Sequence, residues 1–297
     1  MAPPVHRIDI ESPDLPTPMN AEPGVVSPKA PQAESLPLNL DSSRLLLRDG
    51  PGYNYFRRST SPERVQRKAQ AIELSAEILS PGLTNPNFLV LRERRRILTQ
   101  WLEQLPKTGL TVLDVGGRLQ PYRSLLADRI RSYTGVDPVF EGLLNVAAVG
   151  EALPFRSDVF DLVLCTQVLN YSADPFRMIA EIRRVLRPGA ALFLSVPAIF
   201  PRYADQRWRF MPAGLETLLS TFSSFKIEPE GRSIAGLFRL FNLFVDAVCL
   251  ERFKGSWRTS RLVASAVFPV MNLSGQLLDV LSGNTQFTTN YSCLALK

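Results

Sequence analysis

The sequence predicts an α/β fold in which a mostly parallel sheet is covered by helices. From about residue 111 to residue 200, short apolar runs alternate with helical segments, and this alternation is typical of a parallel sheet. The chain has 297 residues, of which 45% are hydrophobic, so it is long enough to bury a core of this type. One apolar run ends on Asp114 and continues into Gly116 and Gly117, which is typical of the entrance to a nucleotide-type cofactor site.

The first 57 residues are predicted to form a disordered tail. Proline is frequent among the first forty residues, together with Ser, Glu and Asp. Such a segment lacks the regular apolar pattern that offsets the entropy lost on ordering. The only histidine, His6, lies here, which argues against Ser/His and Cys/His hydrolase chemistry. Because the N-terminus has no apolar core of a signal peptide, a cytoplasmic location is the expectation.

Charge and cysteine content exclude several kinds of protein. The formal net charge is +6, and we interpret it as scattered surface arginines, with an anionic partner as the alternative. The three cysteines, Cys165, Cys249 and Cys293, lie far apart and form no CxxC pair, which argues against a disulfide framework or a structural zinc site. We therefore expect no metal and no nucleic-acid partner.

Residues 58–110 are predicted to hold two helices. The first follows Ser61 and Pro62, which suit the N-cap and the first helical position, and Pro81-Gly82 ends it. A second helix is expected over about residues 88–105, where apolar residues recur on one side. Its run RERRR, residues 92–96, is interpreted as a solvated helix face rather than a nucleic-acid patch.

Residues 111–231, together with 286–297, are predicted to form the main domain. Strands are expected in TVLDV (111–115), YTGVD (133–137), FDLVLCT (160–166) and ALFLSVP (191–197). Helices are expected at about 121–130 and 174–187. A further weak strand, LNVAAV, follows the second strand after only a few residues. Since a parallel crossover normally needs a dozen or more residues, the helix at this place is expected to be missing or reduced to a turn.

Residues 232–285 are predicted to form an apolar helical insertion. Its first helix has a narrow polar stripe of Arg232, Arg239, Asn242 and Asp246. Its second helix is uncharged, contains Pro269 and is slightly short for a membrane span. We interpret both as buried helices that pack on the sheet or cover a substrate. Interfacial membrane contact is the alternative.

The acids at two strand ends indicate the kind of cofactor. In an open α/β sheet, ligands bind outside the carboxyl ends of the strands, and Gly116 and Gly117 allow a tight turn there. Asp114 would oppose the pyrophosphate of a dinucleotide but suits S-adenosylmethionine, which carries an ammonium and a sulfonium. Asp137 ends the next strand and can accept hydrogen bonds from both ribose hydroxyls. The alternative for Asp137 is a turn-forming residue before Pro138.

These motifs, taken in order, resemble the class I S-adenosylmethionine-dependent methyltransferases of the type 11 group. The resemblance rests on VLDVGG, GVDP, GEALPF, FDLVLCTQVL and EIRRVLRPGAALFLSVP. It covers about residues 111–200, and RWRFMPAGLETLLS is similar to the continuation in members from polysaccharide-biosynthesis gene clusters. The resemblance implies a Rossmann-like sheet with an antiparallel last strand. It also implies that SSFKIEPEG and TTNYSCLALK are the sixth and seventh strands.

The resemblance also implies cofactor contacts at matching positions. Residues that would face the methionine part are Asp114, Gly116, Gly117 and Arg118, with Thr166 and Gln167 beside them. Asp137 and Pro138 would lie at the ribose, and Glu151, Ala152 and Leu153 would border the adenine.

Three positions depart from the family's pattern. The family commonly has glycine in place of Arg118, aspartate in place of Val149, and Glu-His in place of Asn170-Tyr171. We expect Arg118 to point outward and leave its backbone to the cofactor. Backbone carbonyls near Gly150 are expected to replace the missing adenine acceptor, and the acceptor specificity is expected to have shifted.

The loop PAIFPRYADQRWRF, residues 197–210, is the predicted acceptor-binding segment. Its arginines favour anionic substrates, and its aromatic residues can stack on sugar or ring faces. The candidates are Arg202, Tyr203, Arg207, Trp208 and Arg209. A surface loop anchored by Trp208 is the alternative. If the acceptor is a hydroxyl, Asp205 and Tyr171 are the candidate general bases.

Three hypotheses about function remain open at this point. The first is a methyltransferase that methylates a small-molecule or glycan acceptor, at an oxygen, by in-line displacement. The second is a catalytically silent relative that serves as a binding or partner protein, which Arg118 and Val149 favour. The third, a nicotinamide oxidoreductase, is disfavoured by Asp114 and by the missing GxGxxG. The apolar insertion and the resemblance to polysaccharide-cluster members together point to a glycan acceptor that is lipid-linked, with peripheral membrane contact as the alternative.

Overall fold

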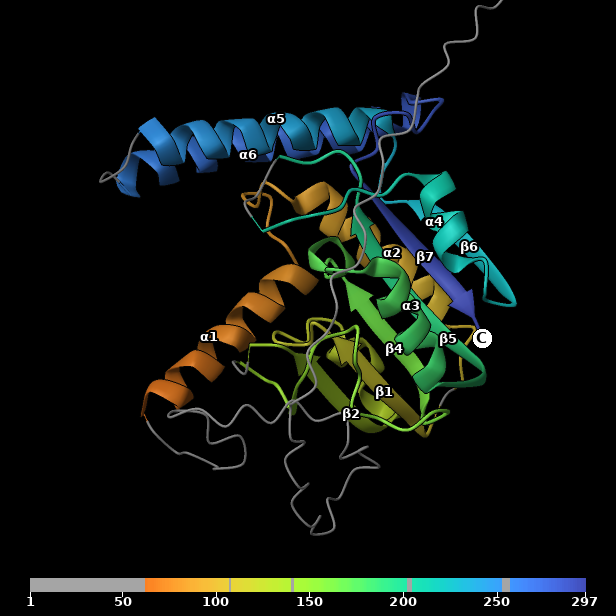
Figure 1. The fold of residues 1–297 in the computed structure, drawn as a ribbon. Coiled ribbons are helices and arrows are strands. Elements are labelled where there is room, and N and C mark those ends of the chain that lie inside the picture. The colour runs from red at the N-terminus through yellow and green to blue at the C-terminus, as the bar shows by residue number, and fades with distance from the viewer. Residues whose placement is uncertain (1–61, 107, 140–141, 202–204, 253–256) are drawn as a thin grey trace, which may run out of the picture. The chain divides into compact units, whose positions relative to one another are not determined.

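Seven strands form one sheet at the centre of the fold (Figure 1): β1 (Leu110–Val115), β2 (Ile130–Asp137), β3 (Val146–Ala147), β4 (Phe160–Thr166), β5 (Leu186–Pro197), β6 (Ser224–Pro229) and β7 (Asn290–Leu296). The computed structural model describes residues 62–297 except 107, 140–141, 202–204 and 253–256, so the predicted tail lies outside the described residues. The spatial order is β3-β2-β1-β4-β5-β7-β6. Neighbouring strands are parallel except around β7, which is antiparallel to β5 and β6. The predicted mostly parallel sheet with an antiparallel last strand is confirmed.

Helices connect and cover these strands: α1 (Pro62–Leu79), α2 (Phe88–Leu102), η2 (Arg123–Arg129), η3 (Leu169–Tyr171), α3 (Pro175–Val185), α4 (Pro212–Leu219), α5 (Ser233–Arg252), α6 (Trp257–Leu278) and η4 (Asp279–Leu281). Three of these, η2, η3 and η4, are 3₁₀ helices, and η2 lies where the helix at about 121–130 was predicted. The helix α3 ends two residues earlier than predicted, because Pro188 disfavours a helical residue before it. No helix occurs among the described residues between β2 and the two-residue strand β3, which agrees with the prediction.

Side chains of the central strands alternate between two apolar layers. Leu113 and Val163 belong to the layer that packs on α3 and α4, whereas Val112 and Leu164 belong to the layer that packs on α2. Successive residues of a strand point to opposite faces of a sheet. Because both faces are covered, these strands are apolar at nearly every position, which explains the continuous apolar runs of the sequence.

The hairpin formed by α5 and α6 lies at the sheet edge where the parallel strands end (Figure 1). Both β5 and β6 are antiparallel to β7, so β6 ends at the same edge as β5, and β7 begins there. The segment between β6 and β7 therefore starts and finishes at the same edge of the sheet as the carboxyl ends of β1, β2 and β4. This edge is where an open α/β sheet binds its ligands.

Polar side chains fix the hairpin to the rest of the domain. Asn242 of α5 donates to Asn272 of α6 at 2.9 Å, and Asn272 donates to the carbonyls of Leu83 and Asn85 at 2.7 and 3.0 Å. Arg239 donates to Asn290 Oδ1 at 2.6 Å. Its guanidinium also lies over the ring of Phe200, which belongs to the predicted acceptor-binding segment 197–210, here called the acceptor loop. Arg239 and Asn242 of the predicted polar stripe are thus buried, whereas Arg232 precedes α5 and is exposed, and Asp246 is half-buried.

The expectation that these two helices bury their apolar sides is wrong for part of that surface. Phe241, Phe244 and Leu277 are exposed, whereas Arg239 and Asn242 are buried. The physical reason is that Arg239 and Asn242 find their hydrogen-bond partners on the inner side of α5, in Asn290 of the sheet and Asn272 of α6. The side of α5 that carries this stripe therefore faces inward and the opposite, apolar side faces outward.

The run RERRR also differs from its interpretation as a solvated helix face. Arg92, Arg95 and Arg96 of α2 are exposed, but Arg94 is only 4% exposed. Arg94 follows Val90 by four residues and precedes Ile97 by three, so it lies on the apolar side of the helix. The run is a solvated face with one buried member.

Candidate cofactor site

The turn after β1 can be formed only by glycine. Gly116 has a φ of +79°, and a Cβ at this position would lie 2.1 Å from Cγ2 of Val168. The N–H groups of Gly116 and Gly117 both donate to the carbonyl of Val136, at 2.7 and 3.2 Å. The backbone therefore makes the tight turn at the end of β1 and stays without a side chain at its closest approach to β4.

Asp114 is a buried carboxyl group in β1, two residues before Gly116 of this turn. It is 4% exposed, and its Oδ2 accepts a hydrogen bond from Tyr133 Oη at 2.7 Å. Burial raises the pKa of Asp114 to about 7, and the charge of Asp137 acts in the same direction, whereas the Tyr133 hydrogen bond opposes both. Asp114 thus titrates near neutral pH, which is common for groups in functional sites.

Asp137 ends β2 on the same face of the sheet as Tyr133 and close enough to act on the charge of Asp114. Its Oδ1 accepts from the N–H of Val139 at 2.9 Å. This is the turn-forming contact that the sequence offered as the alternative, and Pro138 within that turn is exposed. The structure therefore brings Asp137 to the edge where the glycine turn lies.

The side chain of Arg118 is exposed. Its backbone N–H donates to the carbonyl of Gly116 at 2.8 Å, and its carbonyl accepts from the N–H of Leu143 at 2.9 Å. The neighbouring Gln120, which the sequence did not single out as a site residue, is buried with a φ of +50° and donates to the carbonyl of Leu143 at 2.7 Å. The segment after the glycine turn is thereby held to both backbone polar groups of Leu143.

The predicted adenine border is a segment with many internal contacts. Glu151 Oε1 accepts from Ser172 Oγ at 2.5 Å and from the N–H of Ala173 at 2.8 Å. Burial acts to raise the pKa of Glu151, but these hydrogen bonds outweigh it and lower the pKa. Leu153 is fully buried, and its N–H donates to Glu181 Oε2 at 2.9 Å. Ala152, which lies between them, is half-buried.

Gln167 lies one residue beyond the end of β4, and its φ of +58° is rare for a residue other than glycine. Its backbone N–H donates to the carbonyl of Ser195 at 2.8 Å, and its side chain donates to Ser195 Oγ at 3.0 Å. Thr166 before it is half-buried. Backbone conformations of this kind persist only where the surroundings enforce them, and they are common in ligand-binding loops.

A buried ion pair is connected to Gln167 and the loop that follows β4. Arg94 Nη2 and Glu230 Oε2 are 2.8 Å apart, and their side chains are 5% and 0% exposed. Glu230 also accepts hydrogen bonds from Ser195 Oγ at 2.5 Å and from Ser292 Oγ at 2.7 Å. Burial by itself lowers the pKa of Arg94, but the Glu230 carboxylate raises it above its ordinary range. The network connects α2 to Ser195 and, through it, to Gln167. The apolar-face position of Arg94 was the sequence signal that could have revealed it.

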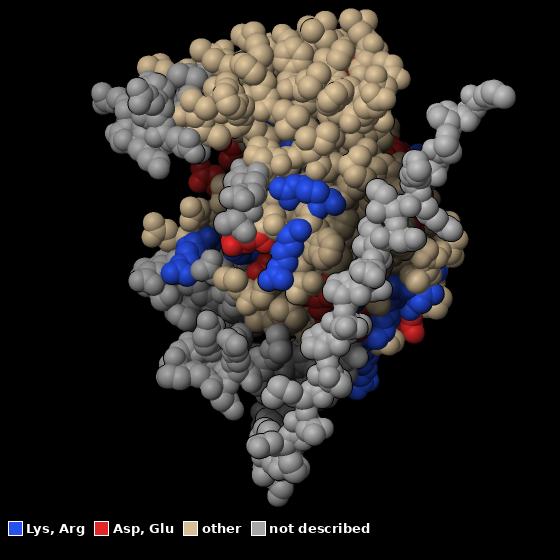
Figure 2. Space-filling view, turned by 45° about the horizontal axis from the view of Figure 1, so that its top comes forward, with Lys and Arg blue, Asp and Glu red and all other residues tan. Residues whose placement is uncertain are grey.

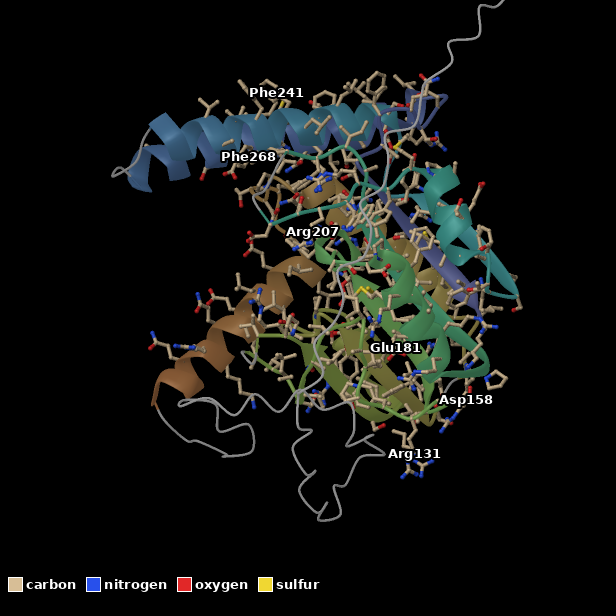
Figure 3. The ribbon with its side chains drawn as sticks, viewed as in Figure 1. Arg131, Asp158, Glu181, Arg207, Phe241 and Phe268 are labelled. Atoms are coloured by element: carbon tan, nitrogen blue, oxygen red, sulfur yellow. The ribbon has the colours of Figure 1, made fainter. Side chains whose placement is uncertain are left out.

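The acceptor loop is attached to η3. The N–H groups of Arg207 and Trp208 donate to the carbonyl of Asn170 at 2.8 and 3.1 Å, and Trp208 Nε1 donates to the carbonyl of Ser172 at 2.8 Å. Tyr171 is 46% exposed, and its hydroxyl accepts from Gln206 at 3.1 Å. The loop is therefore anchored by Trp208, and Figure 3 shows Arg207 on the side of the domain that faces the hairpin.

The remaining predicted acceptor residues differ in their surroundings. Arg209 donates to the carbonyls of Trp208 and Pro201, both at 3.0 Å. Asp205 is exposed. Arg202 and Tyr203 lie outside the described residues. The structure thus places two of the predicted arginines, Arg207 and Arg209, on one anchored segment.

Asn170 has a buried side chain without a protein partner. It is 0% exposed, and among the described residues neither its Nδ2 nor its Oδ1 has a hydrogen-bond partner. Buried amide groups are nearly always paired with protein, water or ligand, because an unpaired group is costly. Asn170 follows the end of β4, and its carbonyl accepts the hydrogen bonds that hold Arg207 and Trp208 of the acceptor loop.

Comparison with known proteins identifies the domain. Residues 113–194 match a family model described as a methyltransferase domain. The chain therefore carries a methyltransferase domain over residues 113–194. An uncharacterized methyltransferase of Mycolicibacterium vanbaalenii is 35% identical over 101 residues, which are 30% of this chain and 40% of the relative. An uncharacterized methyltransferase of Mycobacterium tuberculosis is 33% identical over 102 residues, with the same shares.

The fold of the methyltransferase domain agrees with a solved structure. Phosphoethanolamine N-methyltransferase 2 of Haemonchus contortus, in complex with S-adenosyl-L-methionine, superposes with a TM-score of 0.50 at 16% identity. The superposition covers 79% of this chain and 58% of that chain. For the two mycobacterial relatives, the match with this chain covers less than half of the relative's length.

Proposed function

We propose that this chain binds S-adenosylmethionine at the ends of β1, β2 and β4 and transfers its methyl group to an acceptor. The observation that carries the proposal is Asp114, a buried carboxyl group with a pKa of about 7 beside a turn that only glycine can form. A buried carboxylate needs a cationic partner. The ammonium of the cofactor's methionine part supplies one, and the turn at Gly116 and Gly117 lets the backbone approach it.

Further cofactor contacts complete this proposal. Asp137 accepts hydrogen bonds from the ribose hydroxyls, with Pro138 in the same turn. Arg118 contributes its backbone only, and the exposure of its side chain supports this assignment. The other proposed contacts are Glu151, Ala152 and Leu153 at the adenine and Thr166 and Gln167 at the methionine end.

The chain's own part in the chemistry is positioning. When bound, S-adenosylmethionine supplies a methyl group on a positively charged sulfur. The protein then has to hold the acceptor in line and exclude water. We assign acceptor binding to the loop around Arg207 and Trp208, which its hydrogen bonds to η3 fix in place. The unpaired amide of Asn170 supports a polar acceptor group or an ordered water at this place.

The acceptor that this surface favours is a small molecule or glycan with anionic or ring-shaped parts, methylated at an oxygen. The exposed Arg207 favours an anion, and Trp208 offers a ring for stacking. A hydroxyl acceptor loses a proton during transfer. We propose Tyr171 or Asp205 as the group that accepts it, since both are exposed on or beside the acceptor loop.

Cofactor binding can be tested by calorimetric titration. We expect the protein to bind S-adenosylmethionine and to ignore NADH. Asp137→Ala is expected to lower the affinity about ten- to a hundredfold, because it removes hydrogen bonds to a charged acceptor. Asp128→Ala, which removes an exposed acid of η2, serves as the control and should bind like the wild type. A wild type that binds neither ligand, or an Asp137→Ala protein with unchanged affinity, would contradict the proposal.

Acceptor binding can be separated from cofactor binding at Trp208. Trp208→Phe keeps an aromatic ring but removes the hydrogen bond to the carbonyl of Ser172. We expect methyl transfer to fall about fivefold, as for one lost hydrogen bond of about 1 kcal/mol, with unchanged affinity for S-adenosylmethionine. A screen of hydroxyl-bearing acceptors with methyl-labelled cofactor supplies the assay. Equal loss of both properties would place Trp208 at the cofactor instead.

A further inference from the structure

The hairpin of α5 and α6 turns an apolar face to the outside. Twelve of the twenty exposed large apolar side chains among the described residues lie between residues 237 and 287. On α5 they are Leu237, Phe241, Phe244 and Val248, which recur at intervals of four, three and four residues and so share one side of the helix. Phe244 is 64% exposed. We call this surface, with its continuation on α6, the outer face of the hairpin.

The outer face continues on α6 with the same helical spacing. Val270, Leu273 and Leu277 are 55%, 45% and 70% exposed and recur at intervals of three and four residues. No Lys, Arg, Asp or Glu occurs between Leu262 and Leu278. The outer face on α6 is therefore uncharged.

The outer face lies opposite the side that docks on the domain. Asn242 and Asn272 join the two helices to each other and to the segment before α2. On a helix of 3.6 residues per turn, Phe241 and Phe244 lie far from the stripe of Arg239 and Asn242. Figure 3 shows Phe241 on the side of the hairpin away from the sheet and Phe268 on the side toward it. Figure 2 shows this part of the surface as a broad tan area with charged residues at its borders.

We propose that the outer face of the hairpin docks onto the surface of an anionic lipid bilayer. Soluble monomers rarely expose contiguous apolar patches of this kind without a partner. A protein partner normally meets a surface that mixes apolar groups with hydrogen-bonding groups, whereas every exposed residue of α5 between Leu237 and Val248 is apolar. A lipid surface needs no hydrogen bonds from such a face.

The length and charge of the hairpin fit a position in the plane of the membrane surface. In the described part of the chain, no helix combines the length and apolar character needed to cross a bilayer. Helices with one apolar side lie flat at the boundary between headgroups and acyl chains. Arg252, Arg258 and Arg261 occur in the adjoining ends of α5 and α6, with Glu251 as the single acid there. This excess of arginine matches anionic headgroups.

Docking through this face would bring the methyltransferase site to the membrane. The hairpin begins next to Glu230, at the sheet edge that also holds the turn after β1 and the end of β4. An acceptor anchored in the bilayer would then be held at the end of the domain that carries the acceptor loop. The docking itself does not depend on methyl transfer, so each proposal can fail without the other.

Vesicle flotation of the full chain tests the docking. We expect the wild-type protein to float with vesicles of phosphatidylcholine and phosphatidylglycerol, and to float less with phosphatidylcholine alone. The variant Phe241→Ser/Phe244→Ser is expected to lower the bound-to-free ratio at least about tenfold, because two large apolar side chains no longer enter the lipid. Phe176→Ser on α3, where the phenylalanine is 56% exposed, is the matched control and should float like the wild type.

A second variant and a mass measurement distinguish lipid docking from misfolding and from self-association. Val270→Ser/Leu277→Ser on α6 should reduce flotation in the same way, so misfolding of one variant does not decide the result. Circular dichroism checks that each variant is folded. A wild type that stays at the bottom of the gradient, or folded variants that float unchanged, would overturn the proposal. Light scattering that gives two chains for the wild type and one for both variants would assign the outer face to a second copy instead.

Discussion

Replacing Asp114 with asparagine is expected to remove most of the affinity for S-adenosylmethionine and, at neutral pH, to stabilise the protein without cofactor. The substitution keeps the shape of the side chain and an acceptor for the Tyr133 hydroxyl, which lies 2.7 Å from Asp114 Oδ2. It removes the buried negative charge. Losing one partner of a buried charge pair typically costs about 3 to 5 kcal/mol. We therefore expect at least a hundredfold lower affinity.

The pH dependence of stability follows from the raised pKa of Asp114. The folded-state pKa of about 7 lies above the ordinary value of 3.8. Between these values the folded protein holds a proton on Asp114 that the unfolded chain has lost. The free energy of unfolding therefore decreases as pH rises from about 4 to about 7, by up to about 4 kcal/mol, and stays low above that. Asp114→Asn should lack this decrease.

The pH dependence of cofactor affinity has the opposite sign. The ammonium of the cofactor interacts with the ionised carboxylate, so affinity should increase as pH rises through about 7 and then level off. Urea denaturation and calorimetric titration at pH 5 and pH 8 measure both properties. Asp128→Asn, an exposed acid in η2, is the control. If wild type and Asp114→Asn respond to pH alike, the assigned role of Asp114 is wrong.

Replacing Glu230 with alanine is expected to destabilise the fold by about 3 to 5 kcal/mol. The substitution leaves the guanidinium of Arg94 buried without its carboxylate, which lies 2.8 Å away in the wild type. The hydroxyls of Ser195 and Ser292 lose their acceptor as well. Because Ser195 also holds Gln167, we expect weaker cofactor binding in addition to lower stability.

A double variant separates the ion pair from general disruption of the core. Arg94→Met/Glu230→Met removes both charges and should recover much of the lost stability, since a buried ion pair is often replaceable by apolar groups. Arg96→Ala, in the same arginine-rich run but exposed, should change the stability by less than about 1 kcal/mol. Urea denaturation measures all three proteins. A loss below about 1 kcal/mol for Glu230→Ala would show that the network contributes little.

Patterns that repeat along the chain predicted the architecture well. The strand over residues 160–166 was predicted with the bounds that β4 has, because a short apolar run covered on both faces is visible in the sequence itself. The short connection between β2 and β3 was also predicted, from the chain length that a crossover needs. The bounds of β5 were not, because Leu186 joins that strand through pairing with Phe160, which lies 26 residues earlier.

The sequence predicted the candidate-site residues at the strand ends, but it did not predict the side chains that surround and support them. Asp114, Gly116 and Asp137 lie at one sheet edge because parallel strands end together. The tyrosine that donates to Asp114 and the unpaired amide of Asn170 were not predicted in these roles. Such contacts depend on where two side chains meet in three dimensions, which residue type and local spacing do not specify.

The sequence by itself determined the order of the strands along the chain, the turn that requires glycine and the two acids at the strand ends. Each of these depends on near neighbours in the chain, through strand periodicity, backbone conformation or the position of a residue at the end of an apolar run. Only the tertiary structure decided the pairing of Arg94 with Glu230, which are 136 residues apart. It likewise decided which side of the α5–α6 hairpin faces outward. Arg239 and Asn242 on the polar side of α5 had to find hydrogen-bond partners in β7 and α6, and this requirement left the apolar side exposed.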